Sequence, residues 1–347
     1  MKTATRYFAI TGVLALLLAS AASAQEGSEF VDNIERERLA QTGMKFLNIS
    51  VSPRAAAMGS AATTHESSSM SMFYNPAGMG SMPTAVHVAF GQVQWIGDID
   101  YNMAAIAFRP GQGNYGVVGL TLVAANYGDF VETIRFDNDE GYLRLGTFSP
   151  TAIAVGLGYA RSLTDRFSVG AHAKYVHQEL TSGGVMSYAN ESAERSSFNE
   201  GTMAFDFGVL YETGFRSLDF GMSVRNLSGE ITYAEENFEL PLTFHVGASM
   251  DMVDLTALNA NLHSVLLSID AERPRDYSEQ LKAGVEYMFM NTFALRAGYT
   301  FPTDEQGINL GAGVQTGVSS MRIGVDYAYT QFGLFGNVNR FALHLGL

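Results

Sequence analysis

Apolar residues occupy every second position at the end of the chain. In residues 340–347, phenylalanine and leucine alternate with polar or small residues, and residues 281–289 and 321–329 repeat this pattern. Successive side chains of a strand point to opposite faces, so each segment predicts a strand with one apolar face. A soluble sandwich would bury that face against a second sheet, whereas a transmembrane barrel would turn it toward lipid.

The N-terminal sequence favours the transmembrane barrel over the soluble sandwich. Lys2 and Arg6 precede an apolar stretch at 7–18, and the small residues that follow end in Ala22-Ser23-Ala24, so we expect residues 1–24 to be a secretory signal peptide. No later segment has the run of about 20 apolar residues that a membrane-spanning helix requires. The protein should therefore cross a membrane with strands, which predicts the outer membrane of a Gram-negative bacterium.

The amino-acid composition limits the modifications and partners to be expected. The chain has no cysteine, so we expect neither disulfides nor a lipid-modified cysteine. Its formal net charge of −14 argues against nucleic acid as a partner. Outer-membrane lipid is the partner that the alternation itself implies.

About fourteen amphipathic segments follow residue 83, and an even number is typical of bacterial barrels. They are 84–96, 99–109, 114–127, 150–161, 166–180, 201–213, 216–227, 241–252, 261–271, 278–289, 292–300, 307–315, 320–330 and 339–347. The predicted fold is all-β: a transmembrane antiparallel barrel over residues 84–347, preceded by an N-terminal region at 25–83.

The connections between these segments give a second indication. If the N-terminus is periplasmic, the periplasmic connections include the tight ones, at 110–113, 164–165, 213–215, around 291 and at 316–319. The longest connections, about 128–149 and 181–200, then fall outside the cell, as expected for outer-membrane barrels. A soluble all-β protein is the alternative, because alternation in any single segment is a weak signal.

Charged residues recur at the inward positions and predict a polar lumen of mixed charge. The candidate lumen residues are His172, Lys174, Asp206, Glu286, Arg296, Arg322, Asp326 and Arg340. Glu286 should face Arg296 across one turn, and Asp326 could face Arg340 across the last loop. We expect such pairs to neutralise the interior rather than to act as a transport relay.

Four aromatic residues and one histidine are candidates for membrane anchoring and for catalysis, respectively. Trp95, Tyr101, Tyr175 and Tyr287 lie near segment ends and suit aromatic girdles at the membrane interfaces. His172 could face a luminal serine such as Ser168, but no third group that would orient a dyad is evident. We therefore expect no enzyme, and no metal or cofactor motif is apparent.

The region before the barrel carries the most specific motif. Residues 46–61 contain Arg54-Ala55-Ala56-Ala57-Met58-Gly59-Ser60-Ala61, and residues 71–79 contain Tyr74-Asn75-Pro76-Ala77-Gly78. This pattern resembles the N-terminal signature of the PorV/PorQ family, relatives of the FadL-type barrels. The resemblance extends over most of the chain, since the fourteen segments and the closing strand after residues 333–336 also fit it.

The resemblance implies a plug that is formed before the first strand. The segment is too polar and too rich in small residues to span lipid, Asn75-Pro76 sets a turn, and Gly78 permits a close approach to the wall. The candidate plug residues are Arg54, Met58, Gly59, Tyr74, Asn75, Pro76, Ala77 and Gly78.

The same resemblance implies a function. PorV-like proteins belong to the type IX secretion apparatus and bind and shuttle the C-terminal domains of exported proteins, so exported cargo and a secretion-pore complex become the expected partners. FadL-like relatives instead pass hydrophobic small molecules through the lumen, which is the alternative. A purely structural outer-membrane protein is the third hypothesis.

The two long connections are the candidate partner surface. Phe130, Tyr142, Phe148 and Tyr188 lie in them among acidic residues. Exposed aromatic groups in an acidic surround suit a protein partner that carries basic and apolar groups. The alternative is that these loops are polar only for solubility.

Overall fold

The computed structural model describes residues 42–181, 185–189, 192–233, 236–319 and 321–347. The expected signal peptide at 1–24 and the first part of the expected plug region, 25–41, lie outside the described residues. Within them, no helix is both long and apolar enough to span a bilayer.

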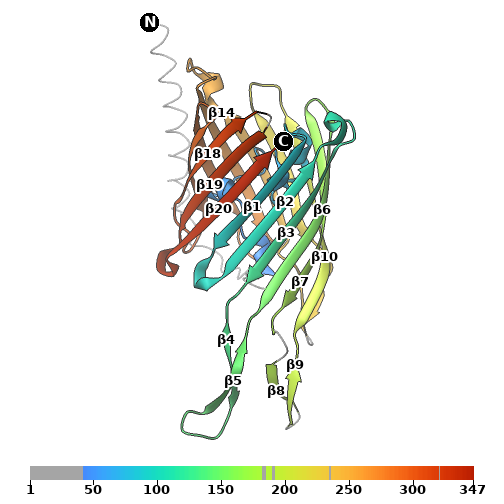
Figure 1. Ribbon diagram of the computed structural model, residues 1–347, viewed down its shortest axis with the longest axis vertical. Helices are drawn as coiled ribbons and strands as arrows, with labels where there is room; N and C mark the ends of the chain where they lie inside the picture. The colour runs from blue at the N-terminus through green and yellow to red at the C-terminus, as the bar shows by residue number, and fades with distance from the viewer. Residues whose placement is uncertain (1–41, 182–184, 190–191, 234–235, 320) are drawn as a thin grey trace, which may run out of the picture. The chain divides into compact units, whose positions relative to one another are not determined.

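Fourteen antiparallel strands form a closed barrel, which confirms the predicted fold class (Figure 1). They are β1 Val86–Gln94, β2 Asp100–Phe108, β3 Val117–Asn126, β6 Thr151–Thr164, β7 Phe167–Glu179, β10 Asn199–Glu212, β11 Asp219–Leu227, β14 Thr243–Asp251, β15 His263–Pro274, β16 Gln280–Phe289, β17 Phe293–Phe301, β18 Asn309–Val318, β19 Met321–Gln331 and β20 Asn337–Gly346. Each strand pairs with its neighbour in this order, and β20 pairs with β1 to close the wall.

Alternation along the strands sets which side chains face lipid. In β6, Ile153, Val155 and Leu157 are exposed, whereas Ala152 and Ala154 are buried on the inner face. β20 repeats the pattern, as its end-of-chain sequence predicts. In water such an apolar belt would be unfavourable, so its surroundings must be lipid.

Short hairpins extend from one end of the barrel. β4 Phe130–Arg135 pairs with β5 Tyr142–Phe148, β8 Val185–Ala189 with β9 Ser192–Ser196, and β12 Ile231–Tyr233 with β13 Glu236–Phe238. Figure 1 shows β4–β5 and β8–β9 reaching beyond the wall, at the end away from the C-terminus. Because long connections of bacterial barrels are extracellular and short turns periplasmic, this end faces the cell exterior.

Residues 42–83, here called the N-terminal segment, lie against the inner face of the wall. Their elements are η2 Lys45–Asn48, α2 Pro53–Ala57, η3 Ser69–Phe73 and η4 Pro76–Ser81. Ser52 and Asn75 cap α2 and η4 by accepting hydrogen bonds from Ala55 N and Ala77 N, and a proline follows each cap. Phe46 and Met72 are buried in a core shared with the wall.

Candidate functional site

The N-terminal segment is joined to the wall by a row of charged side chains, here called the ion-pair ladder: Arg54 of α2, Glu286 of β16, Arg296 of β17, Asp326 of β19 and His344 of β20. Arg54 Nη2 lies 2.7 Å from Glu286 Oε1, and Arg296 Nε lies 2.5 Å from Glu286 Oε2. Arg296 Nη1 then lies 2.5 Å from Asp326 Oδ1, and His344 Nε2 lies 3.3 Å from Asp326 Oδ2. Opposite charges therefore alternate from Arg54 to Asp326, and the imidazole of His344 ends the ladder.

Strand register and one glycine explain how the ladder crosses the wall. Glu286 and Arg296 are direct cross-strand partners, as predicted from the tight turn between them. Arg296 reaches Asp326 past β18, where Gly313 leaves the necessary space. A Cβ at Gly313 would lie 2.1 Å from Asp326 Oδ1 and 2.8 Å from Arg296 Nη1.

The predicted pair of Asp326 with Arg340 is wrong. Arg340 stands opposite Ala328, two positions from Asp326, because the last loop sets a different register from the one assumed. Arg340 instead donates from Nε to Ser50 O and from Nη1 to Thr330 Oγ1, both at 2.8 Å. It thus fixes the N-terminal segment without an acidic partner among the residues that the structure describes.

The girdle prediction is wrong for two of its four aromatic residues. Tyr101 is buried inside the wall, and Trp95 packs edge-on against it, with ring centroids 6.3 Å apart. The Arg340 guanidinium lies 5.5 Å from the Trp95 ring centroid, within cation–π range. Tyr175 and Tyr287 do face outward. The alternation of side chains predicts the inward orientation of both rings. Trp95 shares a face with the buried Val93, and Tyr101 shares a face with the buried Met103.

A second charged cluster forms around Asp206 of β10. Its Oδ2 lies 2.9 Å from His172 Nδ1 and 2.8 Å from Lys174 Nζ, and its Oδ1 accepts a hydrogen bond of 2.7 Å from Asn226 N. Asp206 lies where the β10–β11 register shifts, so it satisfies a backbone donor that the irregular ladder leaves open. All three charged residues are buried as predicted for the lumen.

His172 is not part of a serine dyad. Its Nε2 lies 2.9 Å from Thr121 Oγ1, while Ser168 is hydrogen-bonded to Ser162. Among the described residues, no group of three or more potential ligands is arranged to hold a metal ion.

The eight candidate plug residues lie in the part of the N-terminal segment that contacts the wall. Asn75 Nδ2 donates to Thr63 O at 2.8 Å and to Val209 O of β10 at 3.0 Å. Tyr74 OH is 2.8 Å from Ser50 Oγ and accepts from Ser52 N at 3.0 Å, which holds two turns of the segment together.

Wall glycines make this close packing possible. A Cβ on Gly298 would lie 2.1 Å from Gly59 N, and one on Gly284 would lie 2.4 Å from Met58 O. On the other side of the lumen, a Cβ on Gly170 would lie 2.4 Å from the Pro76 and Ala77 backbone. Within the segment itself, a Cβ on Gly78 would lie 2.1 Å from Glu66 O. Backbone thus meets backbone at these points, where only glycine fits.

Sequence reasoning missed several contact residues. Asp270 of β15 is fully buried, and its Oδ2 accepts from Thr63 N at 2.9 Å and from Thr63 Oγ1 at 2.7 Å. Asp270 lies at an inward-facing position of its strand, and the alternation of that strand predicts that its side chain points into the lumen. Glu66 lies outside the alternating segments, so the sequence around it does not predict its position near Arg54.

Two ionisable groups of the N-terminal segment titrate abnormally. Burial, with a further contribution from the Arg54 guanidinium, lowers the pKa of His65 from 6.5 to about 3. Burial raises the pKa of Glu66 despite the opposing effect of Arg54. A neutral imidazole is therefore favoured at position 65 under physiological conditions.

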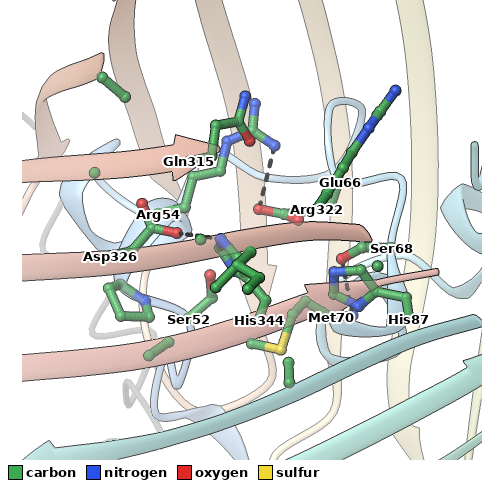
Figure 2. A pocket seen from close by; sticks show the side chains of 18 of the residues that line it. Ser52, Arg54, Glu66, Ser68, Met70, His87, Gln315, Arg322, Asp326 and His344 are labelled. Carbon is green, nitrogen blue, oxygen red and sulfur yellow. Dashed lines mark hydrogen bonds and ion pairs between the residues drawn. The ribbon is translucent and has the colours of Figure 1, made fainter. Parts of the chain in front are cut away.

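Cavities flank the N-terminal segment at both ends. One of about 260 Å³ faces the periplasm and is bordered by Arg54, Glu66, Asp326, His344 and other residues (Figure 2). Another, of about 230 Å³, opens toward the exterior beside Trp95. A mostly apolar cavity between Phe46, Met72 and β3 measures only about 30 Å³, room for about two water molecules.

The β4–β5 hairpin carries exposed apolar side chains. Phe130 is 48% exposed and stacks on Phe148 at a centroid distance of 5.7 Å. Val131, Leu143 and Leu145 are also exposed, and Tyr142 is half-buried. Tyr188 lies in β8 opposite Ala193, but its side chain is outside the described part of the chain.

A family model decides the relationship of this chain to known proteins. The model of the type IX secretion system membrane protein PorP/SprF matches residues 65–344, which is most of the chain. The chain belongs to the PorP/SprF family. The sequence motif predicts the PorV/PorQ family, and that narrower name is not confirmed. The family match supports a type IX secretion protein, and the fold is FadL-like.

Solved structures similar to this PorP/SprF family member include two toluene transporters and a FadL homologue. The toluene transporter TbuX of Ralstonia pickettii has a TM-score of 0.54 at 14% identity, with 84% of this chain and 96% of that chain covered. The toluene transporter TodX of Pseudomonas putida has 0.55 at 12%, covering 84% and 96%. A Pseudomonas aeruginosa FadL homologue has 0.50 at 12%, covering 86% and 98%. At these identities the likeness establishes the fold alone.

No curated protein sequence matches the chain significantly. The family and the barrel together make this an outer-membrane β-barrel of the type IX secretion system. Membership of this secretion family favours association with the secretion machinery over catalysis.

Proposed function

We propose that this PorP/SprF family member binds the C-terminal domains of exported proteins at its extracellular hairpins and shuttles them within type IX secretion. The observation that carries the proposal is the β4–β5 hairpin, which presents apolar side chains to water on the cell surface. Exposed apolar groups of this kind are typical of interaction sites. The PorV/PorQ-like motif around Arg54 and Asn75 supports the same role.

The surroundings of these apolar residues suggest the chemistry of the partner. Asp129, Asp137, Asp139 and Glu140 flank or cap the hairpin and exceed its basic residues in number. A cargo domain with basic groups around an apolar patch would complement this surface in both charge and hydrophobicity. A secretion-pore complex would then receive the loaded barrel.

We propose further that residues 25–83 act as a plug, so that cargo does not travel through this lumen. The ion pair Arg54–Glu286, the hydrogen bonds from Thr63 to Asp270 and that from Asn75 to Val209 attach the segment to β16, β15 and β10. Attachment to several strands opposes displacement of the segment as a unit. The barrel would serve as an anchor in the membrane for its extracellular surface.

The second candidate function is passive transport of hydrophobic small molecules. The likeness to toluene transporters supports this candidate at the level of fold. The apolar cavity beside Phe46, of about 30 Å³, is too small for such a solute, and the strand pairs form a continuous ring. Transport would therefore require the N-terminal segment to move.

Shortening the β4–β5 hairpin tests the proposal. Phe130 and Phe148 are opposite one another, so residues 131–147 can be replaced by a two-glycine link without altering the barrel. We expect exported cargo to lose its surface location and its copurification with the barrel, while the barrel remains heat-modifiable in gels. If cargo remains bound and at the surface while uptake of hydrophobic compounds falls, the transport function replaces the shuttle.

A finer comparison uses matched point variants. Leu143→Thr with Leu145→Thr removes exposed apolar surface, whereas Thr133→Ser with Thr147→Ser changes the same hairpin without removing it. We expect only the first pair to weaken cargo copurification. Equal effects of both pairs would contradict an apolar contact.

A further inference from the structure

The periplasmic cavity has the features of a small-molecule site. It measures about 260 Å³ and lies between the N-terminal segment and strands β1 and β17–β20. Arg54 and Glu66 border it on the side of the segment, and Asp326 and His344 on the side of the wall (Figure 2). A space of this size accepts far more than one water, which needs roughly 10–15 Å³.

The inner part of this cavity lacks one positive charge. Two guanidinium groups, of Arg54 and Arg296, stand against the three carboxylates of Glu66, Glu286 and Asp326. Glu286 forms ion pairs with both guanidinium groups, and Asp326 pairs with Arg296 and contacts the imidazole of His344. Glu66 has the weaker share of this charge, because its nearest guanidinium, that of Arg54, is paired at closer range with Glu286.

Glu66 is also short of a hydrogen bond. The residue is only 6% exposed, and its Oε1 accepts no hydrogen bond within the described part of the chain; Arg54 Nη1 is 3.7 Å away. Thr84 Oγ1, at the same cavity, is likewise buried and without a partner among described residues. Buried groups of this kind are normally satisfied by a water, an ion or a ligand.

The mouth of the cavity has the opposite charge. Arg322 lines it at the periplasmic end of β19, where the side chain is exposed and pairs with no described acidic residue. Gln315 on the neighbouring strand adds an amide to the same rim. A ligand that enters from the periplasm thus meets a cation first and an uncompensated carboxylate deeper inside.

We propose that this cavity binds a small zwitterion, with its ammonium group at Glu66 and its carboxylate at Arg322. The ammonium supplies the missing positive charge and donates to Glu66 Oε1, and the carboxylate gives Arg322 its partner. Burial raises the pKa of Glu66, and an ammonium group bound beside it would lower that pKa again. Binding of a zwitterion in this periplasmic cavity does not depend on cargo binding at the extracellular hairpins.

The test uses 6-aminohexanoate as the probe, titrated into the purified full-length protein in detergent and followed by calorimetry. Hexanoate and n-butylamine are matched probes that carry only one of the two charges. We expect saturable binding of 6-aminohexanoate, weakened about tenfold or more in Glu66→Gln because a charge-assisted hydrogen bond is lost. Asp254→Asn, a half-buried periplasmic acid outside the cavity, is the control and should bind as the parent does.

Arg322→Gln provides a variant whose folding is not in question, since the residue is exposed. It should weaken 6-aminohexanoate binding but leave binding of n-butylamine unchanged. Absence of saturable binding, or equal affinity in the parent, Glu66→Gln and Arg322→Gln, would overturn the proposal and leave ordered water as the partner of Glu66. Hexanoate binding as tight as that of 6-aminohexanoate would overturn it as well.

Discussion

Arg54 and Glu286 form a two-pronged ion pair between the N-terminal segment and the wall, with Nε and Nη2 of Arg54 lying 2.9 and 2.7 Å from the two carboxylate oxygens of Glu286. The two residues are 232 positions apart in the chain. Parallel paired hydrogen bonds fix orientation as well as distance, which a lysine could not do. This contact holds α2 in the lumen.

Arg54→Gln should loosen the N-terminal segment. The change leaves Glu286 with Arg296 as its one cationic partner among the described residues. Breaking one side of a buried ion pair destabilises the folded state by about 3 kcal/mol. The chain has one tryptophan, Trp95, which shares a core with Ile49 of the segment, so its fluorescence reports docking during unfolding. We expect a lower unfolding midpoint and faster protease cleavage within residues 42–83.

Arg273→Gln is the matched control for that experiment. Arg273 also pairs with a glutamate, Glu279, but both side chains are mostly exposed, so the pair contributes at most about 1 kcal/mol. Similar midpoints for the Arg54 and Arg273 variants would mean that the ladder does not hold the segment.

Gly170→Ala should disturb the segment through steric contact alone. The added Cβ would lie 2.4 Å from the backbone of Pro76 and Ala77, neither of which can rotate away, so overpacking should cost about 1–3 kcal/mol. Gly146→Ala is the control, because nothing lies within 4 Å of the position that its Cβ would take. Urea midpoints that shift equally in both variants would place the effect in the strand and not in the contact.

Sequence patterns predicted the barrel because one physical requirement governs it throughout. Every strand must turn apolar residues to lipid at period two, and every backbone group must pair, so the segments and their number follow from alternation. The pair Glu286–Arg296 was predictable for the same reason, since a tight turn fixes the register. The loop before β20 is longer, and the predicted pair Asp326–Arg340 failed by two positions.

The contacts of the N-terminal segment could not be read from the sequence. They join residues with no shared periodicity, such as Thr63 with Asp270 or Asn75 with Val209. The motif indicated which residues of the segment matter but not the strands they meet. For Trp95 the sequence held the answer, and residue type was the wrong guide. Tryptophan is typical of a membrane interface, but Trp95 continues the alternation of β1 on its inward face.

Acid should weaken docking of the segment through His65. Its pKa is about 3 in the folded protein against 6.5 normally, so the stability it contributes is complete above pH 6.5 and is lost as the pH falls from 6.5 toward 3. Glu66, whose pKa is raised, acts in the opposite direction as the pH falls. His65→Gln should therefore lose less stability than the parent between pH 7 and pH 4.5, measured by Trp95 fluorescence.

His177→Gln serves as the comparison for the pH experiment, since this residue lies at the extracellular end of β7 and stacks on Tyr175. This variant removes a histidine that lies away from the N-terminal segment, so it shows which part of the pH profile is specific to position 65. Parallel pH profiles for the parent and His65→Gln would contradict a buried neutral imidazole at position 65.

The cluster around Asp206 gives the sharpest distinction between a structural and a transport role for luminal charges. Asp206→Asn removes the charge that pairs with the buried Lys174. Within the described part of the chain, Lys174 then keeps only a hydrogen bond to Asn226 Oδ1, at 2.6 Å. An uncompensated buried charge should destabilise the barrel by about 3–5 kcal/mol. Replacing both partners, in Asp206→Asn with Lys174→Met, should recover most of that loss, because the unpaired charge is gone. Unfolding midpoints of the single and double variants measure the coupling, and strictly additive losses would show that the two groups do not act as a pair.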